Sequence, residues 1–109
     1  MATFFRNEIV KEVGTVPVKV IQTQPNSRAT IIGLSFTNLT DKFVYVNVEV
    51  QGQDSARGFY LKDSILPSGT SLRAVSTGEK LILAPDNAMY VSSSLNESVD
   101  VIISYVEIT

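Results

Sequence analysis

The side chains available for catalysis in this 109-residue chain are carboxylates, serines and lysines, because the sequence contains no histidine and no cysteine. The commonest general base, the commonest metal ligand and the thiol nucleophile are therefore missing. A Ser–Lys arrangement would need Lys42, Lys62 or Lys80 as its base. No G-x-S-x-G sequence marks a serine nucleophile, and each lysine fits a solvated position at a strand edge.

Five carboxylates fall in or near expected turns and could meet in space. A carboxylate pair can hydrolyse glycosides, and oxygen ligands from loops can bind calcium. A domain this small leaves little room for a substrate groove, however, and no D-x-D-x-D-G loop is present. We interpret the carboxylates as turn formers and as charges that protect sheet edges, and we predict no catalytic residue, no metal and no cofactor. These residues are Asp54, Asp63, Asp86, Glu97 and Asp100, with Asn87 as a further candidate calcium ligand.

Tyrosines are the other candidates for a binding surface. Tyr45 and Tyr60 are expected to point outward from their strands, where an aromatic ring can stack on a sugar. Tyrosine is also common on strands and is enriched at protein interfaces. Contact with another protein is therefore the favoured interpretation, and glycan binding is the alternative.

The elements that position these residues are expected to be short strands. Residues 28–50 contain two runs of alternating apolar and polar residues, separated by a polar turn at 38–42. Such alternation indicates strands with one buried face. We predict that the two runs form a hairpin at the centre of a sheet. Its expected core residues are Ile32, Leu34 and Phe36 in the first strand and Val44, Val46, Val48 and Val50 in the second.

The rest of the chain continues this pattern, with turn signals at roughly 8- to 12-residue spacing and no convincing helix. Pro17 places the strand at 16–20 on a sheet edge, and Pro67 with Gly69 marks a turn. The last strand, 98–108, has apolar residues on both faces, which indicates a central position or a partner on its outer side. We predict an all-β fold: a single antiparallel β-sandwich domain over 1–109, jelly-roll-like, with eight or nine short strands.

Residues 1–13 fit both helical and strand spacing. Their adjacent aromatics are Phe4 and Phe5. In one alternative the segment folds back, packs against the core and covers the last strand; in the other an N-terminal arm presents both rings to a neighbouring subunit. Apolar side chains that a lone sandwich leaves half exposed usually mark an interface. With the outward tyrosines they form the predicted interface set: Phe4, Phe5, Tyr45, Tyr60, Ile102, Val106 and Ile108.

Composition narrows the choice of partners. The net charge is −2 and the nine basic residues are scattered, so nucleic acid is not an expected partner. No apolar run approaches the roughly 18 to 20 residues of a membrane-spanning helix, and the first residues do not resemble a signal peptide. Only 18% of residues are charged, so the surface is expected to consist mainly of small polar residues, as in many β proteins that belong to assemblies.

The order of the segments resembles a family of small virion structural proteins from tailed bacteriophages, including phages of marine cyanobacteria. The resemblance rests on the valines of 16–20, the stretch ATIIGLSFTNLTDKFVYVNVEV, and the segments 58–72, 79–91 and 98–108. It implies a non-enzymatic protein, made in the host cytoplasm, that assembles on or decorates the capsid, neck or tail. The implied partners are other virion proteins and further copies of the chain, with a trimer favoured. The alternative is a receptor- or glycan-binding module on the virion.

Overall fold

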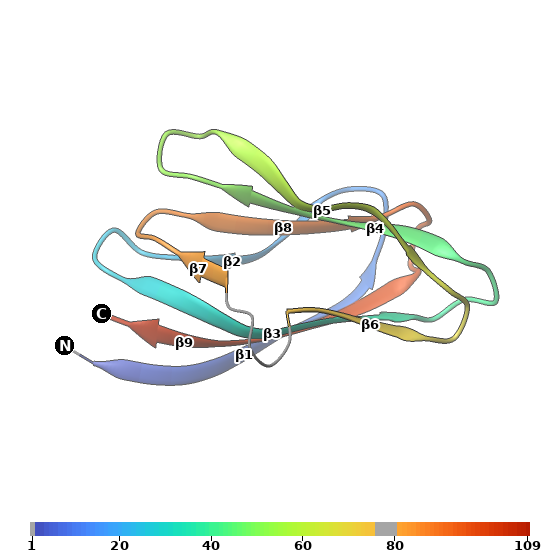
Figure 1. Cartoon of the computed structure of the whole chain (residues 1–109), viewed down its shortest axis with the longest axis horizontal. Helices are drawn as coiled ribbons and strands as arrows, with labels where there is room; N and C mark the ends of the chain where they lie inside the picture. Colours follow the sequence, from blue (N-terminus) through green and yellow to red (C-terminus); the bar gives the residue numbers. More distant parts are fainter. Residues whose placement is uncertain (1, 76–80) are drawn as a thin grey trace.

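A computed structural model describes residues 2–75 and 81–109, which form nine β-strands (Figure 1). No helix in this part of the chain is long and apolar enough to cross a membrane. The strands are β1 (Thr3–Val13), β2 (Val18–Gln22), β3 (Arg28–Asn38), β4 (Val44–Gln51), β5 (Arg57–Leu66), β6 (Ser71–Val75), β7 (Leu81–Leu83), β8 (Ala88–Ser93) and β9 (Val99–Ile108).

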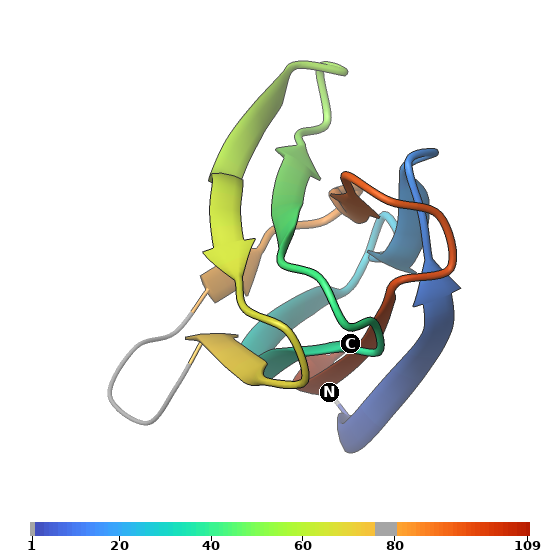
Figure 2. The same ribbon diagram turned by 90° about the vertical axis from the view of Figure 1, so that its right-hand side faces the viewer.

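The strands form two antiparallel sheets that stack face to face (Figures 1 and 2). Sheet A has the order β1-β9-β3-β6, with β7 also pairing β3, and sheet B has the order β2-β8-β4-β5. Early strands pair with late ones, as in β1 with β9 and β2 with β8, and successive pairs alternate between the sheets. This winding of a long antiparallel ribbon is a jelly roll. The prediction of an all-β antiparallel sandwich is confirmed.

The first and last strands, β1 and β9, pair with each other along their length. The Ala2 N–H donates to the Thr109 carbonyl at 3.1 Å, and the Thr109 N–H donates to the Ala2 carbonyl at 3.0 Å. Strand β9 lies between β1 and β3, so the first of the two expected alternatives, a central position, is correct. Residues 3–13 therefore extend sheet A beside β9, and they do not cover its outer face.

The core lies between the inward faces of the two sheets. In β4 and β9 the buried residues alternate with exposed or half-buried ones, so each strand contributes every second side chain. The largest fully buried side chains include Phe36, Ile31, Leu34, Leu66, Leu83, Met89 and Ile103. Val44, Val46 and Val48 are buried as predicted.

The predicted hairpin over 28–50 is wrong. Strand β3 belongs to sheet A and β4 to sheet B, so residues 39–43 cross from one sheet to the other. Alternation identifies the face that a strand buries, and both strands do bury one face. Alternation does not identify the strand to which each one is hydrogen-bonded. Two strands with buried faces can be paired in one sheet, or they can belong to two sheets that pack against each other across the core.

Ile32 is also misplaced by the alternation argument. The register of β3 against β9 shifts between Ile31 and Gly33, so one extra residue is inserted. A bulge of this kind reverses which residues face the core. Ile31 is consequently buried, and Ile32 is 43% exposed on the outer side of sheet A.

Asn38 holds the crossover between the sheets in place. Its buried amide donates to the carbonyls of Lys42 at 2.8 Å, in the connection from β3 to β4, of Leu66 at 3.0 Å, at the end of β5, and of Pro67 at 3.2 Å, in the turn that follows. Its side-chain oxygen accepts from the Thr40 N–H and hydroxyl, each at 2.8 Å. One side chain thus satisfies the backbone of the turn after β3 and of the turn after β5.

Removal of this side chain is expected to destabilise the fold. In Asn38→Ala, buried carbonyls lose their donor, and we expect the free energy of unfolding to fall by about 2 to 4 kcal/mol. Urea denaturation followed by circular dichroism measures the change. The matched control is Asn26→Ala at an exposed turn position, where a change within about 0.5 kcal/mol is expected. Equal effects of the two substitutions would contradict the role of Asn38.

Candidate assembly surface

The outer face of sheet A carries an exposed group of large apolar side chains. The strand register arranges them in rows across the sheet. In one row Ile82, Thr30, Val106 and Phe5 lie side by side on β7, β3, β9 and β1. In a second row Ile9 lies opposite Ile102. We call the group formed by Phe5, Ile9, Ile32, Ile82, Ile102, Val106 and Ile108 the apolar face.

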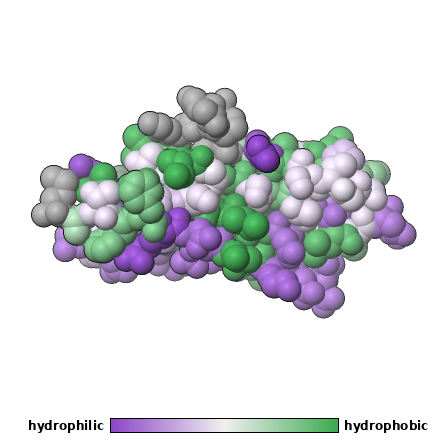
Figure 3. Space-filling model, turned by 90° about the horizontal axis from the view of Figure 1, so that it is seen from below, coloured by the Kyte–Doolittle hydropathy of each residue, from purple (hydrophilic) through white to green (hydrophobic). Residues whose placement is uncertain are grey.

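Five of these seven side chains are exposed, and those of Val106 and Ile108 are half-buried. The exposed fractions are 80% for Phe5, 66% for Ile82 and 62% for Ile9. Between the two apolar rows lie small or uncharged residues, with Gly33 opposite Ser104 and Ser104 opposite Asn7. Viewed from this side, apolar side chains gather in the middle and at one end of the face, with near-neutral and hydrophilic ones between and beside them (Figure 3).

Among the residues that the structure describes, the charged ones in register with the apolar face lie at its rim. Arg28 lies at one end of β3, Asp100 lies near the start of β9, and Arg73 lies on the outer strand β6. The centre of the face therefore has no charge to desolvate when another surface covers it. A sheet face of this composition suits dry packing against a second protein layer, at the roughly 10 Å spacing of stacked sheets.

The outer face of sheet B has a different character. The guanidinium of Arg57 lies 3.9 Å from the centre of the Tyr90 ring and forms a 3.3 Å ion pair with Glu49. The Lys62 ammonium lies 5.4 Å from the centre of the Phe59 ring. Cations already occupy the faces of these aromatic rings, and water solvates the charges. The Arg57 end of this face is therefore suited to solvent more than to dry packing. At the other end Phe43, Tyr45 and Ile65 form a smaller exposed apolar group.

The predicted interface residues divide between these surfaces. Phe5, Ile102, Val106 and Ile108 come together on the apolar face. Phe4 does not join them, because adjacent strand residues point to opposite sides, and its ring lies 4.8 Å from the Arg6 guanidinium carbon. Tyr45 and Tyr60 lie on strands of sheet B.

The sequence analysis missed three members of the apolar face. Ile9 follows Phe5 at a spacing of four, so the period-two pattern would have placed both on one face once residues 3–13 were interpreted as a strand. Ile82 is the middle residue of β7, between Leu81 and the buried Leu83, and alternation again points it outward. Ile32 faces outward only because of the bulge in β3, for which the sequence has no clear signal.

The tyrosines proposed for glycan binding do not form one platform. Tyr45 packs edge-on against Phe43, with ring centres 5.7 Å apart, and lies opposite Ile65 on β5. Tyr60 is five residues from Ile65, roughly 16 Å along an extended strand. Its hydroxyl donates to the Ala74 carbonyl at 3.3 Å, which directs it towards β6.

Two of the candidate catalytic side chains, those of Asp54 and Asp100, support local backbone structure. Asp54 accepts from the Ala56 N–H at 3.2 Å within a turn, and Asp100 accepts from the Glu12 N–H at 3.0 Å beside the bulge in β1. Lys80 lies outside the described residues. Over residues 2–75 and 81–109, no group of three or more acidic side chains is placed to hold a metal ion.

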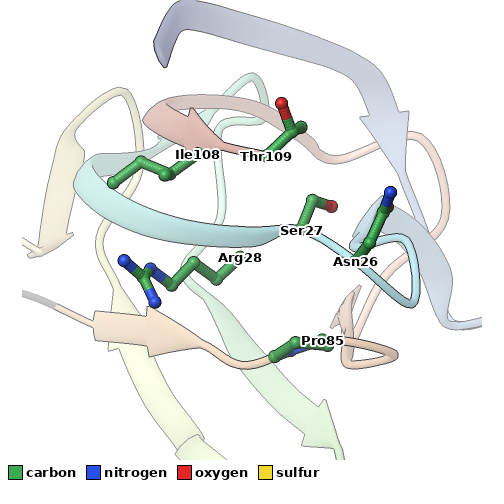
Figure 4. Close-up of a pocket in the computed structure, with 6 residues that line it drawn as sticks. All are labelled: Asn26, Ser27, Arg28, Pro85, Ile108 and Thr109. Atoms are coloured by element: carbon green, nitrogen blue, oxygen red, sulfur yellow. The ribbon is translucent and has the colours of Figure 1, made fainter. Parts of the chain in front are cut away.

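A depression of about 350 Å³ opens near the start of β3 (Figure 4). Among the described residues of its lining, Arg28 has the one ionisable side chain, and the Ser27 hydroxyl already accepts the Gln24 N–H at 3.0 Å. These described side chains include no carboxylate that could act as a general base for the Ser27 hydroxyl. The residues around it are Asn26, Ser27, Arg28, Pro85, Ile108 and Thr109.

Comparisons with known proteins establish the fold. No protein-family model matches the chain, and no curated protein matches it. Among solved structures, a chain of the T13 IBDV (infectious bursal disease virus) particle is similar over 96% of this chain and 30% of its own length, with 9% identity and a TM-score of 0.58. A chain of the Bacillus endospore appendages, described as disulfide-linked pili, is similar over 98% of this chain and 88% of its own, with 5% identity and a TM-score of 0.59. This chain therefore spans under a third of the viral chain, and the likeness at these identities concerns the fold alone.

Tyr105 in β9 is expected to make the free energy of unfolding depend on pH in the alkaline range. Burial raises the pKa of Tyr105 above its ordinary value of 10.0, the carboxylates of Glu8 and Glu107 raise it further, and Arg6 acts in the opposite direction. The folded protein therefore holds the phenol proton more tightly than the unfolded chain does. The resulting stability is present below pH 10 and is lost as the pH rises through the raised pKa.

Tyr105→Phe is expected to flatten the fall in unfolding free energy above about pH 10, because the variant has no phenol at this site to ionise. Urea unfolding at a series of pH values from neutral to strongly alkaline measures the slope. Tyr45→Phe is the matched control and is expected to keep the steep slope, since Tyr105 is intact. A slope unchanged in Tyr105→Phe would show that ionisation of Tyr105 is not linked to folding.

Proposed function

We propose that the protein is a non-enzymatic structural subunit of a tailed-phage virion, and that it joins the particle by packing the apolar face against another virion protein. The observation that carries the proposal is the charge-free centre of an exposed sheet face, with Phe5, Ile9 and Ile82 each more than 60% exposed. An isolated subunit gains nothing from keeping such side chains in water. A covering protein would bury them without desolvating a charge.

Two further features support a structural role. The segment order resembles that of small tailed-phage virion proteins, and the fold is shared with a chain of a viral particle. The sequence has no cysteine, so its subunits cannot use the disulfide linkage named for the Bacillus pili. Assembly would rest on non-covalent packing, which matches the large apolar contribution of the outer face of sheet A.

Quantitative mass spectrometry of purified phage particles from the source tests the proposal. On the order of hundreds of copies per particle would indicate a decoration protein of the capsid, and a few to a few dozen copies would indicate the neck, tail or a fibre. Complete absence from the particles would reject the structural role. A soluble receptor- or glycan-binding module would then be the better explanation, and a glycan array would test it.

Substitutions on the apolar face test the surface itself. Ile82→Lys and Ile102→Lys place an ammonium where the partner would have to desolvate it, so we expect the copy number per particle to fall at least about tenfold. Circular dichroism of the free proteins verifies that both variants fold. The matched control is Phe59→Lys, since Phe59 is 53% exposed on sheet B and is expected to tolerate the charge. Equal incorporation of all three variants would show that the apolar face is not the assembly surface.

A further inference from the structure

Strand β1 has one edge that no described element pairs with. It forms the end of sheet A, and its register against β9 is unbroken from Thr3 to Val10 (Figure 2). The two hydrogen bonds between Ala2 and Thr109 show that the even-numbered residues of this part of β1 form the hydrogen-bonded pairs with β9. Because bonding alternates along an antiparallel strand, Phe5, Asn7 and Ile9 direct their N–H and C=O groups away from β9.

The sequence of β1 is self-complementary about Asn7. At equal distances on either side of Asn7, a cation on one side corresponds to an anion on the other, and apolar residues correspond to apolar residues. The segment is Phe4-Phe5-Arg6-Asn7-Glu8-Ile9-Val10. Two antiparallel copies of one strand are related by a two-fold axis, so each residue lies opposite its counterpart across the centre. Residues that lie opposite each other also share a face of the sheet.

We propose that two copies of this chain pair their β1 strands antiparallel, with Asn7 opposite the partner's Asn7. Arg6 then lies opposite the partner's Glu8, Glu8 lies opposite the partner's Arg6, and Phe5 lies opposite the partner's Ile9. Three residue pairs exchange roughly six backbone hydrogen bonds. Sheet A becomes continuous across the two-fold axis, and the two apolar faces merge into one surface. The contact extends the proposed assembly function and rests on it for its biological use.

Charge selects this register over its neighbours. Centring the pair on Arg6 would place that guanidinium opposite its own copy, and centring it on Glu8 would place two carboxylates together. Of these three neighbouring registers, the one centred on Asn7 aligns opposite charges twice. The Arg6 guanidinium is already held on this strand by its 2.9 Å ion pair with Glu107 and by the Phe4 ring. Charges on an edge strand discourage pairing with foreign strands, and here they match a second copy of the same strand.

Asn7→Pro is the sharpest single test. The Asn7 N–H points away from β9, so proline removes a donor that only the second copy would use, and edge strands tolerate proline at such positions. Sedimentation equilibrium of the full chain at about 0.1 mM should show a dimer for the wild type and for the control Asn7→Ala. We expect Asn7→Pro to weaken the dimer by about 100-fold or more. A wild-type monomer, a trimer, or a dimer unaffected by proline would overturn the proposal.

Charge reversal provides a second test that does not depend on proline. Arg6→Glu alone and Glu8→Arg alone each place like charges opposite one another, so each variant should be monomeric. Mixing the two should restore a dimer, because every opposing pair in the mixed species has opposite signs. Circular dichroism verifies folding of each variant, and failure of the mixture to dimerise would overturn the register.

Both tests are made on free protein. A protein that does not dimerise would contradict the β1 contact but not the structural role in particles. A protein that is absent from particles would contradict the structural role, and the β1 contact could still be measured in solution.

Discussion

The antiparallel ladder between β1 and β9 determines both surfaces on which the proposals rest. It joins the two ends of the chain and makes β9 a central strand. It also places Phe5 beside Val106 and Ile9 beside Ile102, which builds the apolar face from segments that are far apart in the sequence. The same ladder leaves the other edge of β1 with unpaired N–H and C=O groups. A different pairing partner for β1 would remove the face and the edge together.

The two sheets divide the tasks of solubility and contact between them. Sheet B carries cations over aromatic rings and the Arg57–Glu49 ion pair on its outer side, which water can solvate. Sheet A carries isoleucine and phenylalanine with small polar residues between them, and its charges lie at the rim. This asymmetry means that covering the centre of the sheet A face desolvates fewer charges than covering the Arg57 end of sheet B. A dimer through β1 would retain the asymmetry, because a two-fold axis perpendicular to the sheet keeps like faces on the same side.

The sequence predicted the sandwich, the central last strand and four of the seven residues that form the apolar face, because alternation reports directly which side of a strand is buried. It could not predict which strands pair. Residues 28–50 look like a hairpin, yet β3 and β4 lie in different sheets, held at their crossover by Asn38. Nor could alternation place Ile32, since a single bulge moved it to the outside. The sequence cannot separate Phe4 from Phe5, because residues 1–13 fit both helical and strand spacing. In strand β1 the two side chains point to opposite sides of sheet A.

The central claim is that the outer face of sheet A is covered in the assembled particle. Covalent footprinting of side chains, carried out on the free protein and on purified particles, measures that coverage residue by residue. The account predicts that labelling of Phe5 and Ile102 falls by about tenfold in the particle, while Phe59 and Tyr45 on sheet B change little. Protection of Phe59 and Tyr45, with Phe5 and Ile102 still labelled as in the free protein, would contradict it.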